Sequence, residues 1–111
     1  MTEIVLVCSK DGCLRACSAK GHAGFAAKGK DIVCASETTI LRTALDVLEK
    51  SDTLRIRADA PSRGQLAFIV EEGESLNRER LVCVADFIRC GVKALSDEYP
   101  DNIHLREIIE E

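Results

Sequence analysis

The sequence predicts a single small α/β domain with the element order ββαββαβ, in which two helices pack on one mixed or antiparallel sheet. Two segments repeat apolar residues at intervals of three and four, which is typical of amphipathic helices, and short strand-like runs bounded by turn residues flank them. A chain of 111 residues supports one domain with one modest core. Because 46% of the residues are hydrophobic and only 4% are aromatic, we expect a core of aliphatic side chains.

An N-terminal hairpin is the first expected feature. Residues 3–8, EIVLVC, read as a strand that is buried on both faces. The Asp11-Gly12 pair is a strong signal for a hairpin turn, and residues 13–20 follow as the second strand. This strand would place Gly21 and His22 at its end, where functional side chains often lie.

A first helix is expected from about Ile32 to Lys50. Asp31 precedes it and is a good N-cap residue, because its carboxylate can accept a hydrogen bond from a backbone N–H of the first turn. Cys34 would then lie in that first turn. The apolar face of this helix consists of Leu41, Ala44, Leu45 and Leu48.

A second hairpin and a second helix follow. Residues 53–58 alternate as a strand with one exposed face, residues 61–64 form a turn, and residues 65–70 form the paired strand. Ser75 can cap the second helix, which Pro100 brings to an end. The apolar positions of this helix are Leu81, Val84, Ala85, Ile88, Val92 and Leu95.

A short last strand is expected at the C-terminus. Ile103 and Leu105 alternate with His104 and Arg106, which indicates a strand at a sheet edge or packed across a partner. His104 is expected on the surface of that strand, without a catalytic role.

Composition argues against several classes of protein. A formal net charge of −4 disfavours nucleic-acid binding, because phosphate binding needs a basic surface, although an acidic enzyme can still attract a basic substrate. No apolar run reaches the length of a membrane-spanning helix, and no secretory signal is apparent. Six cysteines without such a signal indicate reduced thiols, so we expect a cytoplasmic protein.

A histidine and a cysteine, His22 and Cys34, stand twelve positions apart and are joined by a loop. Unpaired backbone N–H groups and the positive end of the helix dipole favour a thiolate in the first helical turn. A thiolate with an imidazole nearby is the smallest set of groups that nucleophilic cysteine catalysis needs. We therefore expect neither a metal nor a cofactor. Gly21, Gly24 and Gly29 would give the loop the freedom to close on a peptide.

The stretch GHAGFAAKGKDIVCA, residues 21–35, closely resembles the signature of the small bacterial ribosomal-processing cysteine proteases. The resemblance covers nearly the whole chain in length and element order, and its specificity rests on G-H-A, on G-x-D-I-V-C-A and on their separation. It implies that His22 and Cys34 are the catalytic pair of an endopeptidase. It also implies that the enzyme trims a short N-terminal extension from one large-subunit ribosomal protein during ribosome assembly, and that the enzyme is a homodimer.

Three residues near the pair, Asp31, Ala35 and Phe25, have expected supporting roles. Asp31 caps the helix or orients His22, and we favour capping. Backbone N–H groups around Cys34 and Ala35 are the candidate oxyanion hole. Phe25 either contacts the substrate or anchors the loop to the core.

The sequence departs from the family pattern directly after the cysteine, where the family usually continues C-A-A-V-S and this chain has CASET. Thr38 keeps a hydroxyl at the position of the serine. Glu37 places a carboxylate about one helical turn after Cys34, where it opposes thiolate formation, although screening by solvent would reduce the effect. Glu37 therefore leaves open a non-catalytic relative that holds the ribosomal-protein precursor without cutting it.

A zinc-stabilised domain is the remaining alternative. Its ligands would be Cys8, Cys13, Cys17 and His22. The chain has no paired C-x2-C motif, however, and these cysteines fall on strands across a hairpin, which disfavours a metal site. Cys83 and Cys90, seven positions apart, are expected to be packed on one face of the second helix.

Overall fold

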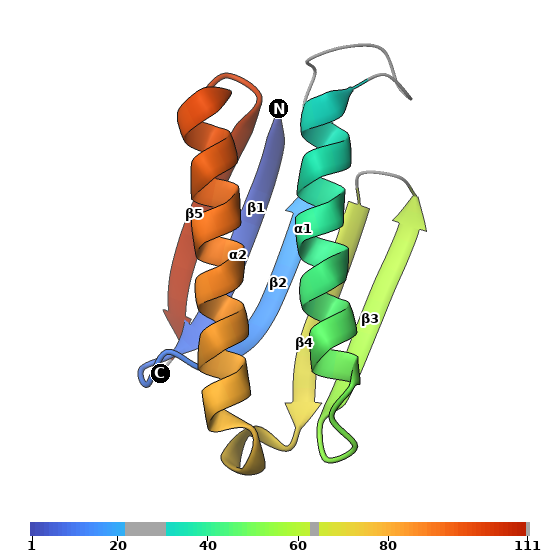
Figure 1. The fold of residues 1–111 in the computed structure, drawn as a ribbon, viewed down its shortest axis with the longest axis vertical. Coiled ribbons are helices and arrows are strands. Elements are labelled where there is room, and N and C mark those ends of the chain that lie inside the picture. Colours follow the sequence, from blue (N-terminus) through green and yellow to red (C-terminus); the bar gives the residue numbers. More distant parts are fainter. Residues whose placement is uncertain (22–30, 63–64, 111) are drawn as a thin grey trace.

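A computed structural model describes residues 1–21, 31–62 and 65–110 and confirms the expected α/β domain (Figure 1). Its elements are β1 (Thr2–Ser9), β2 (Leu14–Lys20), α1 (Ile32–Glu49), β3 (Arg55–Ser62), β4 (Gln65–Glu72), a single 3-10 turn η1 (Glu74–Leu76), α2 (Arg78–Glu98) and β5 (Ile103–Glu110). The order of helices and strands is the expected ββαββαβ.

Within the described residues, the sheet has five strands in the order β3-β4-β2-β1-β5. β1 pairs antiparallel with β2 and parallel with β5, and β4 pairs antiparallel with both β2 and β3. The sheet is therefore mixed, and the last strand lies at one edge, as expected. That strand is longer than its sequence pattern indicated, because it runs beside the whole length of β1.

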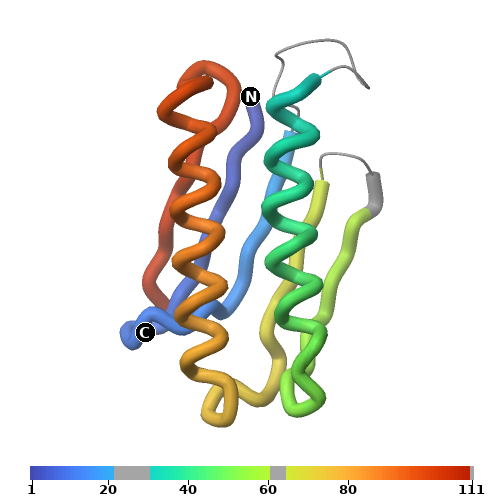
Figure 2. The backbone as a smooth tube through the Cα atoms, viewed as in Figure 1, coloured from blue at the N-terminus to red at the C-terminus, as the bar shows by residue number. Residues whose placement is uncertain are grey.

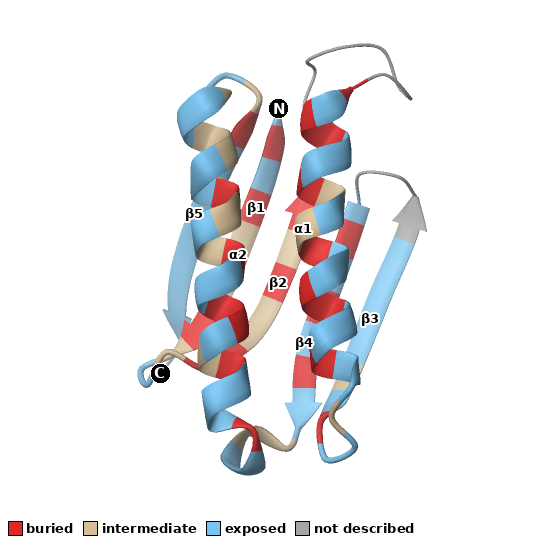
Figure 3. Ribbon diagram, viewed as in Figure 1, coloured by how far each residue is buried: buried red, intermediate tan, exposed pale blue. Residues whose placement is uncertain are grey.

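Both helices cover the same face of the sheet, so the core is one layer between helices and strands (Figure 3). The largest fully buried hydrophobic side chains are Phe68, Ile4, Leu6, Leu14, Leu41, Leu48, Leu81, Ile88, Ile103, Val33 and Val92. All but one of these are aliphatic, in agreement with the composition. In the described part of the chain, neither helix combines the length and the apolar character needed to cross a membrane.

The first strand is not buried on both faces, which corrects the expectation for residues 3–8. Burial alternates along β1: Ile4 and Leu6 face the helices and are fully buried, whereas Val5 and Val7 are half-buried. The reason is that no helix among the described residues covers the second face of the sheet. We call this second face the open face.

The second hairpin also differs from the expectation. β3 continues through Pro61 to Ser62, so the expected turn at residues 61–64 starts too early, and residues 63–64 lie outside the described part. A proline is tolerated here because β3 is an edge strand and its pairing with β4 is irregular between Asp59 and Ser62.

The start of α2 is set by Asn77 and not by Ser75, which lies in η1. Asn77 makes no capping bond to the helix but is buried and joins two loops. Its Nδ2 donates to the carbonyl oxygen of Gly73 (2.8 Å) and to Thr53 Oγ1 (3.0 Å), and Ser51 Oγ donates to its Oδ1 (2.7 Å). Asn77 therefore ties the segment after α1 to the segment before α2.

We predict that Asn77→Ala lowers the free energy of unfolding by about 2 kcal/mol, because it leaves buried partners without their hydrogen bonds. Urea unfolding measures the change. The control Ser75→Ala removes an exposed hydroxyl and should alter stability by no more than about 0.5 kcal/mol. Equal losses in the two variants would contradict the assignment of Asn77 as the residue that joins these loops.

Candidate active site

The described members of the predicted catalytic stretch lie toward one end of the molecule. Figure 2 shows that β2 ends, α1 begins and the N-terminus lies at this end, whereas the β1–β2 turn and η1 lie at the other. Gly21 follows the last residue of β2, and Asp31 precedes the first residue of α1. Cys34 lies in the first turn of α1 and is 8% exposed.

Asp31 caps α1, as expected. Its backbone is extended (φ −80°, ψ 102°), and its Oδ1 accepts a hydrogen bond from the backbone N–H of Cys34 at 2.9 Å. The carboxylate also lies at the positive end of the helix dipole, so charge and hydrogen bonding favour the same helix start.

The same geometry shows how the N–H groups expected to form the oxyanion hole are bonded. The N–H of Cys34 donates to the Asp31 carboxylate, and the N–H of Ala35 donates to the Asp31 carbonyl oxygen at 3.1 Å. Both donors are therefore engaged inside the helix. An oxyanion would need other donors, unless the Asp31 cap opened.

Several predicted site residues lie outside the described residues. These are His22, Gly24, Phe25 and Gly29. The distance between His22 and Cys34 and the expected closing of the loop on a peptide therefore stay predictions.

Position 21 requires glycine for a structural reason, in addition to the freedom that we expect it to give the loop. Its φ is +94°, in the left-handed region, and a Cβ at this position would lie 2.5 Å from the carbonyl oxygen of Met1. The same Cβ would lie 3.7 Å from the Cα of Thr2. Thr2 is buried, and its Oγ1 has no hydrogen-bond partner among the described residues. Gly21 thus brings the end of β2 against the N-terminus, directly before His22.

Glu37 is the functional feature that sequence reasoning placed wrongly. It was expected at a solvent-screened position, but it is only 2% exposed and lies on the face of α1 that packs on the sheet. Its Oε2 accepts a hydrogen bond from Thr38 Oγ1 at 3.2 Å, which engages the hydroxyl expected near the nucleophile. Burial raises the pKa of Glu37 to about 7, and the bond from Thr38 opposes part of that rise.

A sequence signal for this burial existed. Cys34, Glu37, Leu41, Leu45 and Leu48 follow one another at intervals of three and four, which is the spacing of the buried face of a helix. A carboxylate in that series must either be buried or distort the helix. The structure buries it.

The described cysteines other than Cys34 do not resemble nucleophiles. Burial, with the charges of Glu37 and Cys8, raises the pKa of Cys17 to about 12. Burial also raises the pKa of Cys8, although Arg89 Nη2 lies 3.8 Å from its sulfur. Cys83 and Cys90 are exposed on α2, contrary to the expected packing, because the buried face of that helix is formed by the aliphatic series around them.

No group of three or more potential metal ligands occurs within residues 1–21, 31–62 and 65–110. Cys13 Sγ lies 3.9 Å from the carbonyl oxygen of Arg78, within hydrogen-bonding distance for a thiol. The expected zinc set also needs His22, which lies outside these ranges, so the zinc alternative stays a prediction.

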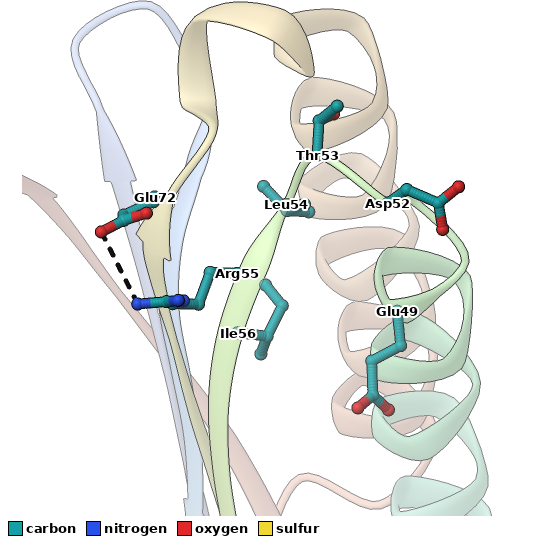
Figure 4. A pocket seen from close by; sticks show the side chains of 7 residues that line it. All are labelled: Glu49, Asp52, Thr53, Leu54, Arg55, Ile56 and Glu72. Atoms are coloured by element: carbon teal, nitrogen blue, oxygen red, sulfur yellow. Dashed lines mark ion pairs between the residues drawn. The ribbon is translucent and has the colours of Figure 1, made fainter.

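A hollow of about 440 Å³ lies at the far end of α1 from Cys34 (Figure 4). Its lining is Glu49, Asp52, Thr53, Leu54, Arg55, Ile56 and Glu72. Arg55 pairs with Glu72 at 3.8 Å, and the carboxylates of Glu49 and Asp52 point in different directions. These groups do not converge on a common point, so the hollow offers no second reaction centre.

Comparisons with known proteins bear on the family and the fold of the chain. The sequence model of a family described as cysteine protease Prp matches residues 1–104. No curated protein matches the sequence.

Solved structures share the fold. The S. aureus ribosomal processing protease Prp with a covalently linked product peptide superposes with a TM-score of 0.83 at 18% identity, covering 96% of this chain and 99% of that chain. The same S. aureus protease with a substrate peptide gives a TM-score of 0.75 at 19% identity, covering 96% and 99%. A Streptococcus mutans protein gives 0.76 at 20% identity, covering 99% and 96%. At these identities, the structures show a common fold.

The buried carboxyl of Glu37 predicts a specific pH dependence of stability. Its pKa rises from an ordinary 4.5 to about 7 in the folded chain, so the proton is held more tightly when the protein is folded. This contribution to stability is complete below about pH 4.5 and is lost as the pH rises through about 7. Relative to Glu37→Gln, the wild type should therefore lose up to about 3 kcal/mol of unfolding free energy between about pH 5 and pH 8.

Urea unfolding of the wild type and Glu37→Gln at the two pH values measures this difference. Glu49→Gln, at an exposed position of the same helix, is the control and should follow the wild type at both pH values. A gap between Glu37→Gln and wild type that does not change with pH would contradict the prediction.

Proposed function

The chain belongs to the cysteine protease Prp family, and we propose that it is an endopeptidase that removes a short N-terminal extension from a large-subunit ribosomal protein. Cys34 is the nucleophile and His22 the general base. The observation that supports these roles most directly is the position of Cys34 in the first turn of α1, directly after the Asp31 cap. The helix dipole at that position stabilises a thiolate.

The proposed reaction proceeds in two steps through an acyl-enzyme. His22 takes the proton of Cys34, and the thiolate attacks the scissile carbonyl carbon. The carbon–nitrogen bond then breaks, and His22 returns the proton to the leaving amine. Water next attacks the thioester, with His22 as base, and releases the new carboxylate and the free thiol. Asp31 acts in this scheme as the residue that fixes the position of Cys34, through the bond to its backbone N–H.

The charge of the chain suits the proposed substrate. Tails of ribosomal proteins are basic because they bind RNA, and a formal net charge of −4 attracts such a peptide. The S. aureus relatives hold substrate and product peptides, which supports a peptide as the partner of this chain. We infer that the protein acts in the cytoplasm, where ribosomal proteins are made and where the free thiols of its six cysteines stay reduced.

A non-catalytic relative is the second candidate, and Glu37 is the observation that favours it. An ionised carboxylate one turn after Cys34 opposes formation of the thiolate. Such a protein would hold the ribosomal-protein precursor through the same site and leave it uncut.

We further propose a homodimer that buries the open face of the sheet. The register places Ile108, Val7, Ala16 and Ile69 side by side across β5, β1, β2 and β4. These four residues form an apolar row, in which Ile69 is 43% exposed and Ile108 is 37% exposed. A row of this kind on an uncovered sheet face is stabilised when a second sheet packs on it.

We predict that Cys34→Ala and His22→Ala each abolish cleavage of a peptide that spans the N-terminal processing site, as measured by mass spectrometry. Either change removes one half of the nucleophile–base pair. Cys83→Ala is the matched control and should cleave at the wild-type rate, because Cys83 is exposed on α2. Cleavage by the Cys34 variant would rule out the mechanism, and binding without cleavage by the wild type would favour the second candidate.

A second prediction concerns the oligomer. Ile69→Lys should convert the dimer to a monomer in size-exclusion chromatography with light scattering, because it places a charge in the middle of the apolar row. Phe87→Lys changes a residue of similar exposure (45%) on α2 and should leave the dimer intact. A wild type that is monomeric at micromolar concentration would contradict the proposed interface.

A further inference from the structure

Cys34 and Glu37 lie three positions apart on the buried face of α1. At this spacing, side chains are neighbours on a helix, with Cβ atoms roughly 5–6 Å apart. Both are removed from solvent, since Cys34 is 8% exposed and Glu37 is 2% exposed. Water therefore screens their mutual repulsion only weakly when both are ionised.

No described cation offsets a charge on Glu37. Thr38 supplies one hydrogen bond from its hydroxyl. β2 presents the Cys17 thiol, whose pKa burial raises to about 12, so Cys17 is neutral at physiological pH.

The charged residues of the last turns of α2 are exposed, and Lys93 is paired with Asp97 at 2.9 Å. On α1 itself, the carboxylate of Asp31 bonds the backbone N–H of Cys34. Among the described residues, the acidic neighbour of Glu37 on its own helix face is therefore Cys34, and no described cation stands between them.

We propose that Glu37 is a positioning residue that competes with Cys34 for a single negative charge, so that its protonated form keeps the nucleophile reactive and its ionised form suppresses the thiolate. The inference rests on the proposed role of Cys34.

Two acidic groups this close titrate as a pair, because the first proton lost makes the second harder to remove. The pKa of Glu37 near 7 places the competition in the physiological range.

The test measures the alkylation of Cys34 by iodoacetamide between about pH 5 and about pH 9 in the full chain. Mass spectrometry of the peptide that contains Cys34 gives a rate for this one sulfur. We expect Glu37→Gln and Glu37→Val to be alkylated at Cys34 about tenfold faster than the wild type near neutral pH, with the midpoint of the pH profile lowered by about one unit. Glutamine keeps the shape of the side chain and an acceptor for Thr38, whereas valine suits the apolar surroundings, so agreement between them separates charge from packing.

Three controls make the result specific. Glu49→Gln removes an exposed carboxylate from the same helix and should leave the Cys34 profile unchanged. Cys83 and Cys90 are exposed in every variant and serve as internal references for alkylation rate. Coincident Cys34 profiles for the wild type and both Glu37 variants would overturn the inference, and so would a change in rate without a shift in the midpoint.

The outcomes for this inference and for the proposed function can be told apart. Cleavage of the processing peptide by a wild type whose Cys34 profile does not depend on Glu37 would overturn the inference alone. If the Glu37 variants shift the Cys34 profile as described but the wild type cuts no peptide, the inference is supported and the proposed endopeptidase activity is overturned.

Discussion

The position of Cys34, the proposed nucleophile, depends on one hydrogen bond, from its backbone N–H to the carboxylate of Asp31. This bond decides where α1 starts, and the start decides the face on which every later residue of the helix lies. The sulfur is placed in the first turn, where orphan N–H groups and the helix dipole favour a negative charge. The same bond uses the N–H of Cys34, and the helix uses that of Ala35. A helix start that favours a thiolate at Cys34 is therefore not automatically an oxyanion hole. While the Asp31 cap is in place, N–H groups other than those of Cys34 and Ala35 would have to bind the oxyanion.

The start of α1 also explains the burial of Glu37. Once Cys34 faces the sheet, a helix of 3.6 residues per turn brings position 37 to the same face, beside the Cys17 thiol of β2. An apolar residue such as valine at this position would extend the core. A glutamate instead introduces a titratable group whose proton is held to about pH 7. Burial thus lowers the stability of the ionised protein and, in the proposed mechanism, couples the charge of Glu37 to that of Cys34. Both effects follow from desolvation of one carboxyl.

The sheet separates the proposed functions of the molecule in space. Both helices pack on one face of the sheet (Figure 1). The start of α1, with the proposed catalytic residue, therefore lies on one side of the strands, and the open face lies on the other. β1 is central to this arrangement, since it pairs with β2 on one side and with the parallel β5 on the other. Its alternating side chains supply the core through Ile4 and Leu6 and the apolar row through Val7. Gly21, pressed against Met1, links β1 to the end of β2 that precedes His22.

Local patterns determined much of this protein. Apolar spacing was sufficient to predict both helices. The Asp-Gly pair was sufficient to predict the first hairpin, and Asp31 was sufficient to predict the start of α1. Each of these features depends on residues that are close neighbours in the sequence. The resemblance in residues 21–35 indicated the family and the catalytic pair, and the geometry between His22 and Cys34 stays a prediction. The helical spacing of Glu37 already indicated a buried position, whereas the extent of its burial depends on the sheet packed against α1. Tertiary structure alone decided that Val5 and Val7 are half-buried and that Asn77 and not Ser75 precedes α2. The physical reason is common to both: burial and hydrogen bonding are set by elements that lie far away in the sequence, and a local pattern does not contain the partner.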